Sequence, residues 1–405
     1  MAPVSGMWHN AQFRAYLGNT GFAGLALAMQ QLLLSWSLIG ILELPADQVG
    51  LLQGLVGVPA IFLMLLGGAR SDNGDPKRLL IGAYLVAPIF PLFLLVMELG
   101  GQFAVWSVLV WALGVSIVQA VSTPAQQAIL NRISADNLQQ GVTAATAIGF
   151  VVQVVGLIIA GQLDRVGMST VLLVQGLSFL GAAIAMRYIS SQAPLQVSPT
   201  SAVDQIRKGL AATLKSKVIM SVLLINFVST IFNAGSFMTV FPFIVKRVYD
   251  GDALLLSVLM AIFFGGAVLA NSLLLKFQPL LRPGRLYLVL QLSRVIVLVM
   301  LFVKGDLWLL VAGTFLWGMN MGVTSNLARM IVQESAAAEY RGRILAVFSV
   351  SMVGSAPIGA IVLGVIIETV GTLEALLPAM LVSVLLAAYG AFMTPIWKYT
   401  SELTR

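Results

Sequence analysis

The chain has 405 residues, of which 59% are hydrophobic and only 10% are charged. A soluble domain carries roughly 25% charged residues, so there is too little charge here to cover a water-exposed surface, and lipid must face most of the fold. The sequence has no cysteine and one histidine, His9, which excludes disulfides, thiolate chemistry and Cys/His metal sites.

Apolar segments of the length needed to cross a hydrocarbon core, about 20 residues, recur along the chain. In the first half they are residues 15–42, 48–69, 79–97, 103–127, 139–162 and 169–186. In the second half they are residues 218–244, 254–275, 286–303, 307–328, 344–367 and 375–396. The predicted fold class is an all-α membrane protein with about twelve transmembrane helices in two pseudo-symmetric six-helix bundles.

A polar stretch divides the two groups of spans. We predict an N-terminal bundle over 1–187, a cytoplasmic linker over 188–217 and a C-terminal bundle over 218–405. From Ser201 onward the linker repeats apolar residues at helical spacing, which favours a short amphipathic helix on the membrane surface. A solvated linker helix is an equal alternative.

The positions of the basic residues test this topology. If the N-terminus is inside, 18 of the 23 Lys and Arg fall in cytoplasmic segments, four fall in the opposite loops, and Arg294 alone lies within a span. Cytoplasmic loops carry the Lys/Arg excess in membrane proteins. Both termini are therefore predicted to be cytoplasmic, and the net charge of +7 indicates membrane orientation rather than nucleic-acid binding.

The two halves of the chain repeat each other at a shift of 203 residues. The aligned pairs are Asp136 with Glu339, Gly156 with Gly359, and Gly161 with Gly364. In each half an acidic loop leads into a span that carries the same pair of glycines. Parallel six-helix repeats are the design of major facilitator transporters.

Two motifs carry a resemblance to that superfamily. After the second span, Gly68 is followed by Asp72 and then by the Lys77-Arg78 pair, which resembles the superfamily signature, although Asn73 stands where the family usually has a basic residue. Later segments are similar to the enterobactin and macrolide exporter branch: Gln333, Tyr340-Arg341-Gly342-Arg343, and Pro357 with Gly359 and Gly364. The corresponding first-half segment lacks the proline that commonly follows the first glycine.

The resemblance implies a cytoplasmic gate. Asp72 would accept hydrogen bonds from a helix N-terminus and attract Arg341 and Arg343. The gating motif on this interpretation is Gly68, Asp72, Lys77, Arg78, Arg341 and Arg343. The alternative is that these charges only satisfy the orientation rule.

Polar side chains inside the predicted spans mark either a pathway or contacts between helices. The resemblance implies that the first, fourth, seventh and tenth spans line a central cavity. The cavity candidates on those spans are Gln30, Gln31, Gln119, Thr123, Asn226, Asn233, Trp317 and Asn320. They predict a neutral cavity lined by amides, and hydrogen bonding between helices without substrate contact stays open for each.

Charges within the spans are nearly absent. For Arg294 we favour a structural role, in which it pairs with a neighbouring helix or snorkels to the interface. None of the 16 Asp and Glu falls within a span, and Leu25 follows Gly24 where many proton-driven relatives carry an acid. The proton therefore stays open as a coupling ion, with facilitated flux as the alternative.

We expect a secondary active transporter that moves a small hydrophobic or amphipathic compound by alternating access. The resemblance favours efflux of a drug or siderophore-like compound across a bacterial inner membrane. An importer or lipid flippase is the alternative on the same fold, and a non-transporting receptor or scaffold is the alternative of another class. No His, Cys or paired carboxylates lie within the spans to perform acid–base, nucleophilic or metal chemistry, so we expect no enzyme, no cofactor and no metal. The expected partners are the lipid bilayer, the substrate and the coupling ion, on a monomer.

Overall fold

A computed structural model describes residues 10–73, 75–134, 138–191, 210–211, 213–277, 279–337 and 340–401. The side chains of residues 60, 62–73, 138 and 139 lie outside that description. The first part of the expected linker helix, residues 201–209, and the aligned acids Asp136 and Glu339 also lie outside it, whereas residues 210–211 and 213–215 are described and are helical. Within the described ranges every regular element is a helix and none is a strand, which confirms the all-α fold class.

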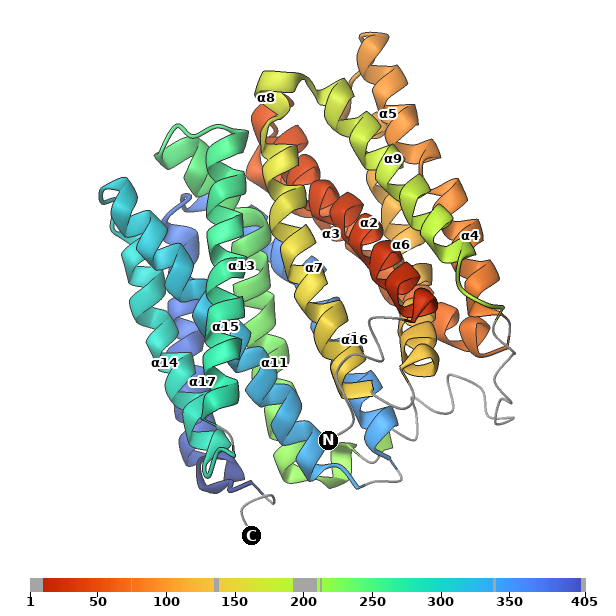
Figure 1. Cartoon of the computed structure of the whole chain (residues 1–405). Coiled ribbons are helices and arrows are strands. Elements are labelled where there is room, and N and C mark those ends of the chain that lie inside the picture. Colours follow the sequence, from red (N-terminus) through yellow and green to blue (C-terminus); the bar gives the residue numbers. More distant parts are fainter. Residues whose placement is uncertain are drawn as a thin grey trace. The chain divides into compact units, whose positions relative to one another are not determined.

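The helices carry the labels of Figure 1, and η marks π or 3-10 segments. In chain order they are α2 (Ala11–Trp36), η1 (Ser37–Ile41), α3 (Ala46–Asn73), α4 (Pro76–Val86), α5 (Ile89–Leu99), α6 (Val105–Ile133), α7 (Leu138–Gly161), α8 (Leu163–Val166), α9 (Met168–Arg187), α11 (Lys217–Gly235), η3 (Ser236–Val240), α12 (Phe241–Phe243), η4 (Ile244–Val248), α13 (Ala253–Lys276), α14 (Pro283–Phe302), α15 (Leu307–Ser335), α16 (Arg341–Thr369), η5 (Glu374–Leu376), α17 (Leu377–Phe392) and η6 (Pro395–Lys398).

Among the described residues, 11 helical segments are long and apolar enough to cross a membrane. The 28 residues of α3 form a further helix of sufficient length. Helices α6 and α15 continue past the expected ends of their spans, to Ile133 and Ser335, because helical hydrogen bonding does not stop where the apolar stretch stops. The expected span 79–97 is built from α4 and α5, which meet at Pro88, a residue without an N–H to donate.

The chain forms two compact units. Unit 1 comprises residues 1–42, 56–202 and 252–258, and unit 2 comprises residues 43–55, 203–251 and 259–405. The predicted division at the linker stays a prediction, because residues 192–209 of the linker lie outside the described residues.

Unit 1 is organised around α2. This helix packs against α7 and α9, while α4 and α5 pack against α6 and α9 (Figure 1). The close approach of α7 to α2 depends on Gly156, where an added Cβ would lie 2.7 Å from the Cβ of Ala28 and 2.8 Å from the carbonyl oxygen of Leu25. Small residues permit such backbone approach between membrane helices.

Unit 2 is organised in the same way around α11. Helix α11 packs against α16, and α14 packs against α15 and α17. At Gly359 on α16, an added Cβ would overlap the carbonyl oxygen of Ile231 on α11. The glycines aligned in sequence, Gly156 and Gly359, therefore make the equivalent helix contact in the two units.

The second glycine pair also has equivalent neighbours. Within unit 1, Gly161 faces Ser257 at the start of α13, and within unit 2, Gly364 faces Gly50 at the start of α3. Helix α3 also forms a side-chain hydrogen bond within unit 2, in which Gln53 accepts from the hydroxyl of Thr239 at 2.8 Å.

Candidate functional site

A buried polar cluster lies where α11, α14 and α15 meet in unit 2. At its centre is Arg294, whose side chain is 3% exposed. Its Nη1 donates to Ser229 Oγ and to Gln291 Oε1, both at 2.6 Å. Its Nε donates to Asn320 Oδ1 at 3.1 Å, and its Nη2 donates to Thr324 Oγ1 at 3.3 Å.

Helical spacing explains why these side chains converge. Gln291 and Arg294 are three positions apart on α14, and Asn320 and Thr324 are four positions apart on α15, so each pair lies on one face of its helix. The amide of Asn320 also donates to the carbonyl oxygen of Leu290 at 2.7 Å, which holds α15 against α14. The cluster is thus a set of crosslinks between three helices.

Among the residues that the structure describes, no carboxylate bonds to Arg294. All its described hydrogen bonds go to hydroxyl or amide oxygens. The bonds to Ser229 on α11 and to Asn320 and Thr324 on α15 agree with the structural role expected from the sequence, which stays a prediction. Arg294 does not snorkel, since its side chain is buried.

A small cavity of about 20 Å³ adjoins the cluster, which is room for about one water molecule. Its lining residues are Asn226, Ser229, Thr230, Asn233, Gln291, Arg294, Met321, Thr324, Ser325 and Met352. Two buried polar atoms of this lining have no hydrogen-bond partner, Asn226 Nδ2 and Asn233 Oδ1. The expectation of a neutral central cavity stays a prediction. The small cavity in unit 2 is not neutral, because the side chain of Arg294 reaches from α14 to the wall that carries the two asparagines.

The structure brings together three cavity candidates of the second half, Asn226, Asn233 and Asn320. Trp317 lies elsewhere, fully buried in an aromatic cluster. Its ring centroid is 5.7 Å from that of Phe237 and 5.7 Å from that of Phe263. This position is that of a packing residue in the core of unit 2.

The cavity candidates on α2 are bonded to neighbouring helices of unit 1. Gln30 accepts a hydrogen bond of 3.1 Å from Gln175, and Gln175 in turn accepts one of 3.1 Å from the indole N–H of Trp111. Gln31 accepts one of 2.9 Å from Gln153. These bonds agree with the alternative interpretation of the polar residues in the spans, which is that they form hydrogen bonds between helices.

The candidates on α6 differ from those on α2, because Gln119 and Thr123 are exposed. The hydroxyl of Thr123 donates to the backbone carbonyl of Gln119 at 2.8 Å, so it bonds within its own helix. That bond uses the backbone of Gln119, and the amide side chain of Gln119 is exposed on unit 1.

The gating residues near the end of α3 fall into two groups. Gly68 and Asp72 lie in α3, and their side chains are outside the described residues. Lys77 and Arg78 surround Asp75, which caps α4 by accepting from the N–H of Lys77 at 2.9 Å. Arg78 Nε is 3.8 Å from Asp75 Oδ2, and the ammonium of Lys77 donates to the carbonyl oxygen of Arg187 at 3.1 Å.

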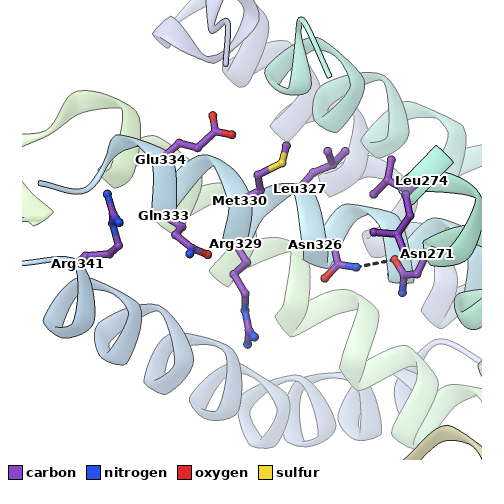
Figure 2. Close-up of a pocket in the computed structure, with 10 residues that line it drawn as sticks. Asn271, Leu274, Asn326, Leu327, Arg329, Met330, Gln333, Glu334 and Arg341 are labelled. Carbon is purple, nitrogen blue, oxygen red and sulfur yellow. Dashed lines mark hydrogen bonds between the residues drawn. The ribbon is translucent and has the colours of Figure 1, made fainter. Parts of the chain in front are cut away.

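Arg341 lies beside a larger pocket of about 580 Å³ at the end of α15. Its lining residues are Asn271, Leu274, Leu275, Asn326, Leu327, Arg329, Met330, Gln333, Glu334 and Arg341. Figure 2 shows Asn326, Arg329 and Gln333 projecting from one face of α15, with Glu334 on the opposite face. The carboxylate of Glu334 accepts from Tyr399 and Ser401, each at 3.0 Å, while Arg343 stacks on the ring of Tyr340.

Sequence reasoning missed two members of the Arg294 cluster. Ser229 and Gln291 are short or neutral side chains that hydropathy does not single out. One signal was present, since Gln291 precedes Arg294 by one helical turn and so shares its face. Ser229 likewise lies between Asn226 and Asn233 at helical spacing on α11.

The chain is similar to a known protein family and to solved structures. The sequence matches, over residues 4–402, the family described as transmembrane secretion effector. No curated protein matches the sequence.

Three solved transporters are similar to the chain. A variant of the nucleoside transporter NupG gives a TM-score of 0.76 at 12% identity, covering 95% of this chain and 100% of that one. A bacterial homologue of the human lysosomal transporter Spinster, inward-facing and unoccupied, gives 0.75 at 14% identity, covering 96% and 98%. A POT family transporter in complex with 5-aminolevulinic acid gives 0.73 at 10% identity, covering 96% of each. Identities this low show a shared fold alone.

Proposed function

The chain belongs to the transmembrane secretion effector family of major facilitator transporters, and from that premise we propose that it is a secondary active exporter of a small amphipathic organic compound. Transport would proceed by alternating access around a site near the middle of the spans. The family description supports the outward direction. We also propose that the membrane is a bacterial inner membrane and that both termini are cytoplasmic, which the distribution of Lys and Arg supports.

The buried polar cluster at Arg294 is the observation that carries this proposal. Polar and charged groups inside membrane helices are costly and mark substrate or ion pathways. Here two unpartnered amide atoms, on Asn226 and Asn233, line a cavity together with the guanidinium of Arg294. Met321 and Met352 on the same lining supply flexible apolar surface of the kind that accommodates varied ligands.

Purified protein in proteoliposomes tests the direction and the energy source. The compound for the assay is chosen by a thermal-shift screen of drugs and amphipathic metabolites. We expect accumulation against a concentration gradient when the substrate is presented at the predicted cytoplasmic face, driven by an imposed ion gradient. Empty liposomes are the control for leakage.

Three results would contradict the proposal. Uphill movement only toward the predicted cytoplasmic face would favour the importer, and movement of labelled lipid between leaflets would favour the flippase. Movement that only dissipates a gradient, with no response to an imposed proton gradient, would show facilitated flux instead of active export.

A further inference from the structure

Arg294 is a buried cation to which no carboxylate bonds within the described part of the chain. It is the only Lys, Arg, Asp or Glu in the buried class among the described residues. Hydroxyl and amide oxygens solvate a guanidinium, but a buried charge is normally paired with an opposite one. An unpaired cation inside the spans therefore points to an anion that is brought by something other than the chain itself.

The guanidinium also retains hydrogen-bonding capacity. Such a group carries five N–H donors, and four of them are used in the bonds to Ser229, Gln291, Asn320 and Thr324. The bond from Nη2 to Thr324 is the longest of these, at 3.3 Å, and the second N–H of Nη2 has no described acceptor. The Nη2 edge is thus the part of Arg294 that an incoming oxygen can approach.

The adjoining cavity has a second donor of the right kind. Asn226 is 6% exposed, and its Nδ2 has no partner, although it lines the same cavity as Arg294. An unmade hydrogen bond of a buried amide is costly, and an acid group is able to satisfy it. With a volume near 20 Å³, the cavity has room for about one oxygen of an acid group, while the rest of that group and the body of the compound lie outside it.

We propose that Arg294 and Asn226 bind the anionic group, a carboxylate or phosphate, of the transported compound, which is therefore an amphipathic acid. Arg294 supplies the charge and the Nη2 donor, and Asn226 donates to the oxygen that enters the cavity. The inference rests on the proposed transport function and deepens it by stating the charge of the substrate.

The test compares acids with uncharged analogues of the same shape. A panel of aryl-alkanoic acids and alkyl phosphates, with 4-phenylbutyrate and its amide 4-phenylbutanamide as the reference pair, is measured by thermal shift and equilibrium binding. We expect the best acid to bind at least about tenfold more tightly than its amide or ester, since a hydrogen bond to a charged group outweighs a neutral one. Stabilisation by none of the acids, or equal binding of acid and amide, would overturn the anion site.

Substitutions at Arg294 and Asn226 distinguish a loss of acid binding from a loss of folding. Arg294→Gln is expected to remove the preference for the acid, and Arg294→Lys to keep part of it, because the charge remains and the forked geometry is lost. Arg282→Gln changes an exposed arginine at the start of the same helix and should leave the preference unchanged. If Arg294→Gln does not fold, Asn226→Leu provides the second measurement, with an expected loss of acid binding in a folded protein. Retention of the full acid preference in Asn226→Leu and Arg294→Gln would refute the assignment.

The anionic group has two sources, a free acid or a lipid headgroup. Delipidated protein is therefore measured with phosphatidylcholine and separately with phosphatidylglycerol. We expect the free acids to bind in both; displacement of every acid by phosphatidylglycerol alone would identify the lipid as the occupant and overturn the substrate assignment.

Transport in proteoliposomes distinguishes this inference from the proposed function, since flux of neutral compounds only would leave transport standing and remove the anion site.

Discussion

Ser229 on α11 accepts a hydrogen bond of 2.6 Å from Nη1 of Arg294 on α14, across 65 positions of sequence. The hydroxyl is one of the few contacts that hold the guanidinium toward α11 and its cavity. The same hydroxyl also accepts from Nδ2 of Asn233 at 3.3 Å. A small neutral side chain therefore orients both the buried cation and a cavity amide.

Ser229→Ala should lower the stability of the protein. Removing the hydroxyl leaves one N–H of a buried guanidinium unsatisfied, which costs about 1–3 kcal/mol. Ser221→Ala is the matched control on α11, because its hydroxyl bonds only to the carbonyl of Lys217 within the same helix. Thermal unfolding in detergent compares the two, and equal melting temperatures would mean that the Ser229 bond contributes nothing to folding.

Gly359→Ala should also destabilise the chain. The added Cβ meets the backbone of α11 at Ile231, which has no side-chain freedom with which to yield, and overpacking of this kind costs about 1–3 kcal/mol. Gly342→Ala in the same helix has nothing within 4 Å of the new Cβ and is expected to be neutral or slightly stabilising. Unfolding midpoints of the two variants check the prediction, and similar midpoints would contradict it.

The gate implied by the motif resemblance is testable at Asp72. Asp72→Asn should favour the inward-open form and slow turnover while folding is retained. A partly exposed charge-assisted contact of about 1–2 kcal/mol shifts a two-state population about five- to thirtyfold. The measurement is the reactivity of an engineered cysteine on the predicted cytoplasmic side, together with flux.

Asp75→Asn is the control for that experiment. Asp75 caps α4, and asparagine is an equally good N-cap, so accessibility and flux should stay unchanged. Unchanged accessibility and flux in Asp72→Asn as well would leave Asp72 as an ordinary loop charge.

The membrane orientation can be measured directly, because the chain has no cysteine. A single cysteine at Ser198 should react with a membrane-impermeant maleimide only after the cells are opened. A single cysteine at the exposed Lys304 should react in intact cells, since that residue falls in a loop predicted to be outside. Labelling of Ser198 from outside intact cells would overturn the predicted topology.

The spans could be predicted from the sequence because lipid leaves the backbone few alternatives to a helix. The glycine repeat was also visible, since glycine is the one residue that lets helix backbones meet this closely. The apolar length that predicts a span is local in the sequence, and the glycine repeat depends on residue type alone.

The roles of single polar residues could not be predicted in the same way. Trp317 and Asn320 lie on one helix, yet Trp317 packs among phenylalanines and Asn320 binds Arg294. Which of them faces a cavity depends on the rotation of α15 against α13 and α14, and periodicity alone does not fix that rotation. The same reason explains why Arg294 was not expected beside Asn226 and Asn233, since its side chain reaches their cavity only through the packing of α14 against α15.

Because Gly156 and Gly359 make equivalent helix contacts in the two units, the effect of replacing such a glycine can be measured at two positions of the same protein. Gly156 and Gly149 share α7 and differ in the same way as Gly359 and Gly342 on α16, since Gly149 has nothing within 4 Å of an added Cβ. A cost measured in one unit can thus be measured again in the other, inside the same molecule and the same detergent. Disagreement between the two would show that equivalent helix contacts differ in how far the surrounding packing can adjust, which no single substitution reveals.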